Sequence, residues 1–336
     1  MTITRLWQSG AETGTLLEFS SIVGAPTAQT TTKYTDGYAY SMANNAQNLG
    51  VVNVTATRQV RIGARIRINN NITDNEVGLL DVRASSTQLA GLHMKGDTLN
   101  LIADVAGTNQ DTDSYASDVW YHMGVDIKIH SSAGWIVVYK DLIEIMRFEG
   151  NTGNSDITNV TLGPLLLASF SGTTYIDDAY IDDTTGEASA AVVPARSFQY
   201  VIPTGNGNYN GNWTGSDGNS VDNYLLVDEI PAASADYIEE TVTDQLESFL
   251  MDTYTLAANE GCVAVIPIVL CQRTGATELI ALGTRYSATD VIGSDLTPPA
   301  SYLMRFERQT TKPGGGAWDQ TAIDGFELVM KSRGTY

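Results

Sequence analysis

The chain has 336 residues and carries 39 acidic residues against 19 Lys and Arg, for a formal net charge of -20. A surface of that sign repels nucleic-acid phosphates and anionic lipid, so we expect no nucleic-acid partner and no membrane partner. Hydrophobic residues make up 43% of the chain, which is enough for sizeable cores, and the length suggests two domains.

The sequence predicts neither a secretory signal nor a membrane helix. Residues 1–14 lack a basic region followed by an apolar core, which a secretory signal peptide requires. The longest strong apolar run is about 263–270, far short of the roughly 20 residues of a membrane helix. We therefore expect synthesis in the cytoplasm.

A two-residue alternation marks β-strands in the first half of the chain. In the segment 60–68, VRIGARIRI, apolar residues at even positions alternate with Arg61, Arg65 and Arg67. This period predicts a strand with one buried and one polar face. Further candidate strands lie at 16–22, 37–42, 77–83 and 88–94. Short strands at this spacing predict an all-β sandwich or jelly roll.

The stretch 120–150 continues the pattern as an antiparallel meander. From Tyr121 to residue 129 the odd positions are mostly apolar, so His122 and His130 fall on the polar face. We expect Trp120 and Trp135 in the core because of their strand positions.

Residues 184–194, TTGEASAAVVP, are small and flexible, and we place a domain boundary there. The second half again reads as short strands, with a Gly- and Asn-rich loop at 205–220. The predicted organisation is an N-terminal arm at 1–12, a jelly roll at 13–184, a linker at 185–196 and a second β-sandwich domain at 197–336.

Four stretches of the first half follow one another in a characteristic order: Trp120-Tyr121-His122, Gly134 to Glu144, Phe148 to Thr152 and Tyr175 to Asp183. In this order they resemble the concanavalin A-like, laminin-G-like jelly roll. The resemblance implies an all-β chain with two β-sandwich or jelly-roll domains in tandem, the first concanavalin A-like.

The second half resembles the C-terminal domains of tailed-bacteriophage virion proteins. The residues that carry this resemblance are Trp213 with its loop, Val227-Asp228-Glu229, Asp236-Tyr237-Ile238 and the later order Ser301-Tyr302, Lys312-Pro313, Trp318 and Gly325. The opening Arg5 to Gly10, with Glu12 and Gly14, also looks like the start of such proteins.

The resemblance implies a non-enzymatic structural protein of the phage virion, either a head-decorating protein or a tail-associated appendage component. Its partners would be itself, as a homo-oligomer, and other virion proteins. Contact with a host surface glycan is a further expectation.

Four aspartates near the end of the first domain are candidate calcium ligands: Asp177, Asp178, Asp182 and Asp183. Hard carboxylate oxygens suit calcium, and the laminin-G-like resemblance implies it as well. The alternative is a solvated strand edge whose charges oppose aggregation. We expect no other cofactor.

The loop residues Tyr209, Asn210, Asn212 and Trp213 are a candidate glycan or partner contact. Sugar sites combine an aromatic platform with amide hydrogen bonds. The alternative is a turn-rich loop whose Trp213 packs into the second core or against a neighbouring subunit. A carbohydrate-binding, lectin-like protein is therefore the rival to the virion role.

A glycanase is the third and least favoured hypothesis. That chemistry needs two carboxylates that flank one glycosidic bond. The Glu-x-Asp-x-x-Glu strand of jelly-roll glycanases is absent, and the adjacent pairs Asp228-Glu229 and Glu239-Glu240 project to opposite faces of a strand. We assign no catalytic residue and expect no enzyme.

Overall fold

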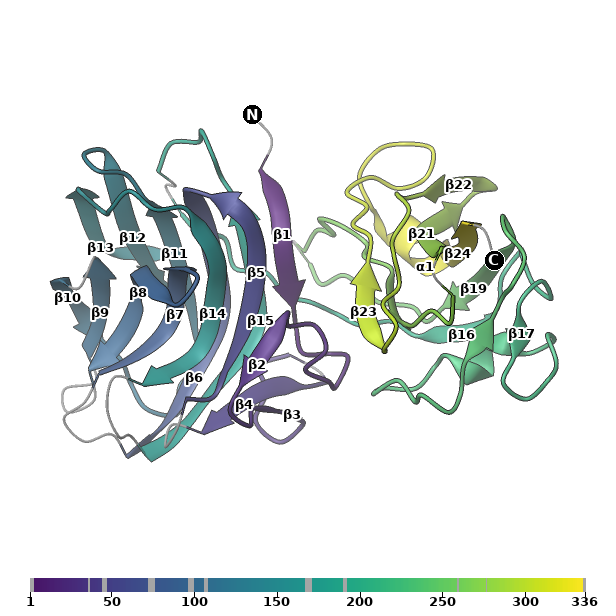
Figure 1. Cartoon of the computed structure of the whole chain (residues 1–336), viewed down its shortest axis with the longest axis horizontal. Coiled ribbons are helices and arrows are strands. Elements are labelled where there is room, and N and C mark those ends of the chain that lie inside the picture. Colours follow the sequence, from purple (N-terminus) through teal and green to yellow (C-terminus); the bar gives the residue numbers. More distant parts are fainter. Residues whose placement is uncertain are drawn as a thin grey trace. The chain divides into compact units, whose positions relative to one another are not determined.

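The computed structural model describes residues 3–35, 37–43, 47–71, 76–95, 100–105, 108–166, 171–189, 192–258, 260–275 and 277–334. The chain divides into two compact units, Met1–Gln199 and Tyr200–Tyr336 (Figure 1). Antiparallel strands make up nearly all of the regular structure, so the all-β fold class is confirmed. In the described part of the chain, no helix has the length and apolar character that crossing a membrane requires.

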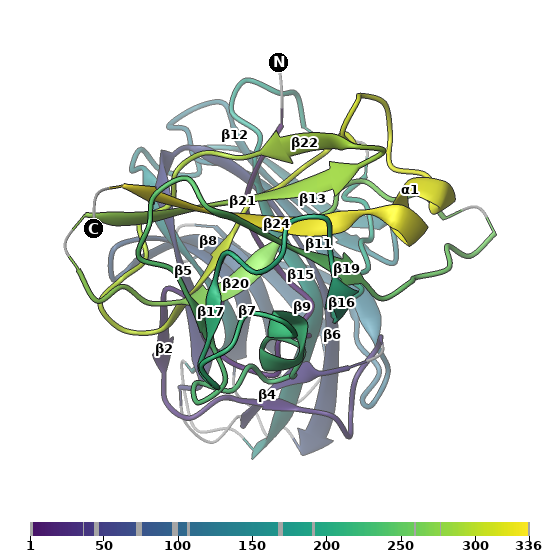
Figure 2. The ribbon, with the colours of Figure 1, turned by 90° about the vertical axis from the view of Figure 1, so that its right-hand side faces the viewer.

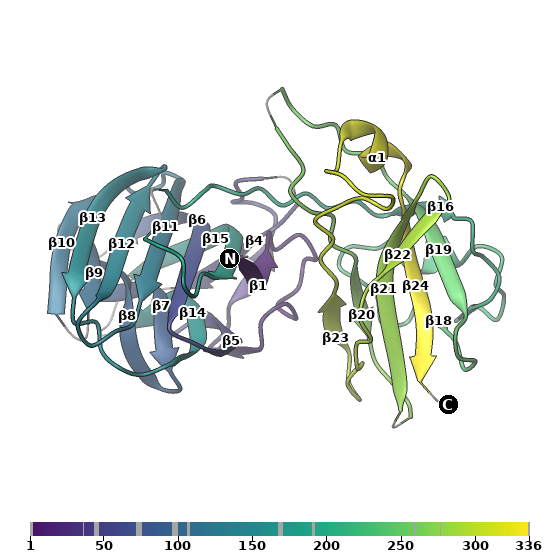
Figure 3. The ribbon, with the colours of Figure 1, turned by 90° about the horizontal axis from the view of Figure 1, so that it is seen from above.

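Unit 1 is a sandwich of two antiparallel sheets (Figure 3). Sheet A has the order β13 (Ile143–Gly150), β12 (Gly134–Lys140), β11 (Tyr121–Lys128), β6 (Gln59–Asn71), β15 (Ser171–Asp183), β4 (Ala39–Ala43) and β3 (Thr27–Gln29), and β1 (Thr4–Ser9) also pairs with β15. Sheet B has the order β10 (Thr108–Ser114), β9 (Asn100–Val105), β8 (Thr87–Lys95), β7 (Glu76–Ala84), β14 (Ile157–Leu166), β5 (Leu49–Thr57) and β2 (Ser21–Val23).

The core of unit 1 lies between these sheets, as the alternation of β6 predicts. Ile62, Ile66 and Ile68 are fully buried in one cluster with Leu80 and Leu92 of sheet B. Burying an isoleucine stabilises the fold by roughly 1.5–3 kcal/mol. The arginines of β6 point the other way, onto the face that we call the outer face of sheet A.

The prediction for Trp120 and Trp135 was wrong, because neither lies in the main core. Trp135 is half-buried and packs on the outer face with Tyr139 and Tyr180. Ile136 and Val138 of β12 face sheet B. Successive side chains of a strand point to opposite faces, so Trp135 lies on the outer face. Trp120 is also half-buried and directly precedes β11.

Parts of the expected arm, 1–12, and of the expected flexible linker, 185–196, are packed on unit 1. Thr4–Ser9 is strand β1, which pairs with the end of β15. In the linker, Val193 is fully buried on the outer face of sheet A. We call residues 192–198 the connector. The Tyr180 hydroxyl donates to the Pro194 carbonyl at 2.5 Å, which fixes the connector to β15.

Unit 2 is built on a five-stranded sheet C, in the order β16 (Pro203–Asn206), β19 (Leu246–Met251), β24 (Glu327–Gly334), β21 (Glu278–Tyr286) and β22 (Thr289–Ile292) (Figure 2). Two small sheets join β17 (Thr214–Gly215) with β18 (Ile238–Glu239) and β20 (Ile268–Cys271) with β23 (Leu303–Phe306). The 3-10 helix η1 is Asn223–Leu226 and the helix α1 is Gln320–Gly325.

The core of unit 2 forms where one face of sheet C meets these smaller elements. Phe249, Leu282 and Met330 of sheet C pack with Trp213 and with Val269 of β20. Two layers of β-structure therefore enclose an apolar interior, as in a small sandwich. The domain limits 13–184 and 197–336 stay predictions.

Gly124→Ala tests how the connector is seated. A Cβ at Gly124 would lie 2.5 Å from the Val193 Cβ, so we expect a loss of ~1–3 kcal/mol in unfolding free energy. Val193→Gly alone should cost ~2–4 kcal/mol of lost burial and added unfolded-chain entropy. This change removes the Cβ and both Cγ atoms, so in the double variant the new methyl group at position 124 meets none of the atoms it would clash with, and the two losses should not add.

Urea unfolding of the three variants measures these energies. Gly261→Ala is the control, because a Cβ there would meet no atom within 4 Å among the described residues. Additive losses in the double variant would contradict the packing of Val193 on Gly124.

Candidate functional site

The predicted sugar-contact loop runs beside β19 and is fixed to it by the backbone. Ser248 N–H donates to the Tyr209 carbonyl at 2.7 Å, and Tyr209 N–H donates to Ser248 Oγ at 2.9 Å. Gly207 N–H donates to the Ser248 carbonyl at 2.7 Å. The loop is therefore held like an additional strand along β19, and Tyr209 lies over sheet C.

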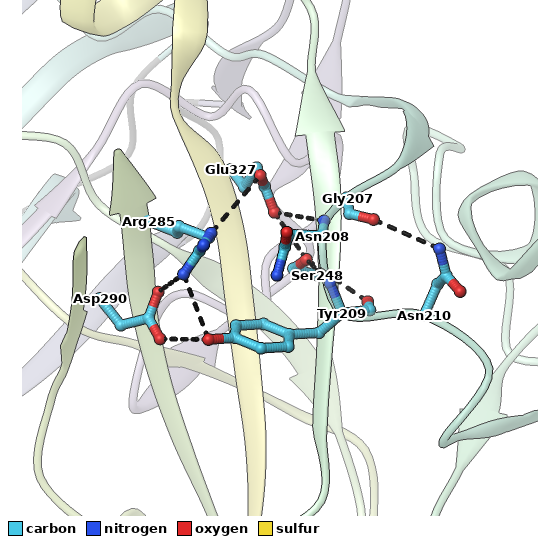
Figure 4. A network of polar contacts seen from close by, with 8 residues as sticks. All are labelled: Gly207, Asn208, Tyr209, Asn210, Ser248, Arg285, Asp290 and Glu327. Atoms are coloured by element: carbon cyan, nitrogen blue, oxygen red, sulfur yellow. Dashed lines mark hydrogen bonds and ion pairs between the residues drawn. The ribbon is translucent and has the colours of Figure 1, made fainter. Parts of the chain in front are cut away.

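A polar network surrounds the Tyr209 ring (Figure 4). The Tyr209 hydroxyl donates to Asp290 Oδ2 at 2.6 Å and accepts from Arg285 Nη1 at 3.2 Å. Arg285 Nη1 also donates to Asp290 Oδ1 at 2.6 Å. The hydrogen bond to Asp290 is the main cause that raises the pKa of Tyr209. The hydroxyl is thus held between a cation and an anion.

Glu327 joins this network to the loop backbone. Its Oε2 accepts from Ser248 Oγ and from Asn208 N–H, each at 2.7 Å. Its Oε1 lies 3.8 Å from Arg285 Nε. The charged groups around Tyr209 are bonded to one another, so the arrangement holds the loop on sheet C.

Trp213 is a core residue of unit 2, and only 8% of its surface is exposed. The backbone N–H of Trp213 donates to Glu247 Oε2 at 3.4 Å. The side-chain amide of Asn223 donates to the Trp213 carbonyl and to Glu247 Oε1, each at 3.0 Å. Burial raises the pKa of the Glu247 carboxyl. This is the alternative interpretation of the sequence, in which the tryptophan packs into the second core.

The two asparagines of the predicted contact, Asn210 and Asn212, are exposed, but their side chains also serve the fold. The Asn212 amide donates to the Leu246 carbonyl at 2.9 Å, and the Asn210 amide donates to the Gly207 carbonyl at 3.4 Å. The structure therefore does not assemble the four predicted residues into one open aromatic platform. Their contact with a glycan or a partner stays a prediction.

The predicted calcium ligands Asp177 and Asp178 lie at a bulge in β15, where Asp178 has a φ of +49°. Asp177 Oδ2 accepts from Tyr34 N–H at 2.9 Å and from Thr35 N–H at 3.3 Å. Asp178 Oδ1 accepts from Phe198 N–H at 2.8 Å. One carboxyl thus holds the loop before β4 and the other holds the connector.

Asp182 and Asp183 serve other contacts. Asp182 forms an ion pair with Arg5 of β1. Asp183 Oδ1 accepts from Thr185 N–H at 2.8 Å and from the Thr57 hydroxyl at 3.3 Å. Among the described residues, no group of three or more His, Cys, Asp or Glu side chains is arranged to hold a metal ion. Calcium binding remains an untested prediction.

The buried carboxyls have strongly perturbed acidity. Burial, with a further contribution from Asp177, raises the pKa of Glu12 to about 8 and that of Asp178 to about 8. Burial also raises the pKa of Asp177 to about 6. These neighbouring carboxyls repel one another when ionised, and this repulsion adds to the effect of burial.

The outer face of sheet A brings together functional groups that the sequence analysis did not combine. Arg65 is opposite Asp177 on β15 and opposite His122 on β11. Its guanidinium carbon lies 4.1 Å from the centroid of the Tyr34 ring, and its Nη1 lies 3.7 Å from Asp141 Oδ1. This stacked and paired cation fixes the orientation of the tyrosine.

A second arginine extends the same arrangement. Arg67 Nη2 lies 3.0 Å from Asp118 Oδ1, and its guanidinium carbon lies 5.9 Å from the Tyr175 ring centroid. The Tyr34 ring stands edge-on to Trp120 with centroids 6.0 Å apart. The parity of β6 and β11 could have placed the arginines and His122 on one face, but Tyr34 comes from a loop with no periodic signal.

His122 lies beneath this surface and is only 1% exposed. Neither ring nitrogen has a hydrogen-bond partner among the described residues. Burial, and then the nearby Arg65, lower the pKa of His122 to about 4. The imidazole is therefore neutral at neutral pH.

Neither protein-family models nor curated protein sequences match the chain. Solved structures with a similar fold include "Cellulose induced protein, Cip1", which is 13% identical with a TM-score of 0.42 over 52% of this chain and 95% of that chain. A Trypanosoma rangeli sialidase is 13% identical with a TM-score of 0.38, over 53% of this chain and only 30% of that chain. A SAP-like pentraxin from Limulus polyphemus is 17% identical with a TM-score of 0.33, over 42% of this chain and 74% of that chain.

His122→Leu should flatten the acid dependence of stability. The folded pKa of His122, about 4, lies below the ordinary 6.5, so protons favour the unfolded state and stability falls as the pH drops from 6.5 towards 4. We expect the wild type to lose roughly 2 kcal/mol more than the leucine variant between about pH 7.5 and pH 5. Urea unfolding at the two pH values measures this difference, and equal acid losses in both proteins would refute it.

Proposed function

We propose that this chain is a non-enzymatic structural protein of a tailed-phage particle, head-decorating or tail-associated, that acts by binding other proteins. The observation that carries the proposal is the packing of the residues that resemble phage virion proteins. Trp213, Val227 and Ile238 are distant in sequence but pack into one hydrophobic cluster of unit 2. A sequence pattern whose members meet in one core is what a shared domain fold produces.

The chemistry of unit 2 is consistent with a role in binding rather than catalysis. Glu247 holds the backbone of Trp213, and Glu327 holds the loop at Asn208. Arg285 is paired with Asp290. These ionisable groups stabilise the unit, and we assign none of them a catalytic role. The proposed partners are further copies of this chain and other virion proteins, and the proposed location is the virion.

The composition of purified particles tests this proposal. We expect mass spectrometry of density-purified virions of the phage that encodes the chain to find it at a constant, multiple copy number per particle. Antibody labelling of intact particles should place it at one repeated position, because virion parts assemble symmetrically. Its absence from infectious, purified particles would reject the structural role.

Carbohydrate binding is the second candidate function, and one observation favours it. Tyr34 is 45% exposed and stands beside the half-buried Trp120 and above Arg65 on the outer face of sheet A. An aromatic ring with neighbouring charged hydrogen-bonding groups is the chemistry that recognises a sugar. A virion protein with such a surface could contact a host glycan without any catalytic step.

A further inference from the structure

We propose that Tyr34, Trp120, Arg65 and Arg67 form a binding site for an uncharged sugar ring on the outer face of sheet A. The inference rests on the second candidate function and deepens it, because it names the site and the class of ligand. It does not depend on whether the chain belongs to a virion.

The aromatic part of the site comes from residues that three elements bring together. On one side of β6, Arg67 is opposite Tyr175 of β15. On the other side, β6 pairs with β11, which begins directly after the half-buried Trp120. Tyr34 reaches this place from the loop before β4, where Asp177 holds its backbone N–H. The rings differ in exposure, and Tyr34 is the most open. A ring with one face on a guanidinium keeps its other face for a ligand.

The polar part of the site supplies both donors and acceptors. Arg65 and Arg67 carry guanidinium groups, and Asp141 and Asp118 carry carboxylates whose side chains are each 49% exposed. A sugar hydroxyl donates one hydrogen bond and accepts others, so it can bridge such a pair.

The charges around the site favour a neutral ligand over an acidic one. Each arginine already has a carboxylate within 3.7 Å, so neither offers an uncompensated positive charge. Asp177 lies opposite Arg65 on the next strand and adds a further acidic group. A sialic or uronic acid carboxylate would meet these anions and the net charge of -20 on the whole chain. A neutral hexose ring meets no such repulsion.

Sugar titrations of the full chain test the proposal. The neutral probes are cellotetraose, maltotetraose and chitotetraose, and the acidic probes are sialyllactose and tetragalacturonate. Binding is measured by calorimetry and by quenching of tryptophan fluorescence. We expect at least one neutral probe to bind with a Kd below about 1 mM, and the acidic probes to bind at least about tenfold more weakly.

Variants separate the site from a general effect on folding. Tyr34→Ala removes the open ring and should weaken binding at least about tenfold, whereas Tyr34→Phe keeps the ring face and should stay within about twofold. Tyr237→Ala is the matched control, since Tyr237 is 40% exposed but belongs to unit 2. Trp120→Leu provides a second loss if Tyr34→Ala does not fold.

Three results would overturn the proposal: no neutral probe binds at about 10 mM, only acidic probes bind, or Tyr34→Ala and Trp120→Leu both bind like the wild type. Incorporation of Tyr34→Phe and Tyr34→Ala chains into particles is measured separately. Failure of sugar binding with normal incorporation rejects this site and leaves the structural role in place.

Discussion

Burial of one side of β6 against sheet B determines what the other side can carry. Successive side chains of a strand point to opposite faces, so the residues before and after each buried isoleucine of β6 lie on the outer face. Arg61, Arg65 and Arg67 are therefore held at fixed intervals on a rigid sheet. Opposing strands then place Asp182 and Asp177 from β15, and Asp126 and His122 from β11, beside those arginines. The ordered charges of the outer face follow from the packing of the core.

Close packing on this face needs residues without side chains at two adjacent positions. Gly63 and Gly124 are opposite each other on β6 and β11. A Cβ at Gly63 would lie 2.3 Å from the Tyr180 ring, and one at Gly124 would meet Val193. The two glycines thus form a shallow seat that Tyr180 and the connector fill. Tyr180 and the connector therefore cover the part of the outer face around Gly63 and Gly124. The exposed aromatic ring of Tyr34 lies away from this covered part.

Strand periodicity predicted much of this architecture, including the all-β class and the polar face of β6. It could not predict which loops fold back onto that face. The composition of residues 184–194 indicated a flexible linker, yet Val193 is buried because the glycine seat gives a β-branched side chain somewhere to pack. The strand position of Trp135 indicated a place in the core, but the parity of β12 puts its side chain on the other side of the sheet. Contacts such as Tyr34 on Arg65 join distant residues, and local patterns do not carry that information.

The two aromatic sites of the chain differ in what their polar neighbours already do. Around Tyr209, the groups of Arg285, Asp290 and Glu327 bond to one another and to the loop, so a ligand would have to break existing bonds to use them. Around Tyr34, the exposed carboxylates of Asp118 and Asp141 lie at the edge of the pairs they form, and the ring itself is open to solvent. Desolvating a satisfied network costs free energy that a weak sugar contact does not recover. Recognition is therefore better supported at the end of sheet A than in the Gly- and Asn-rich loop, although the loop has the composition that first suggests a sugar site.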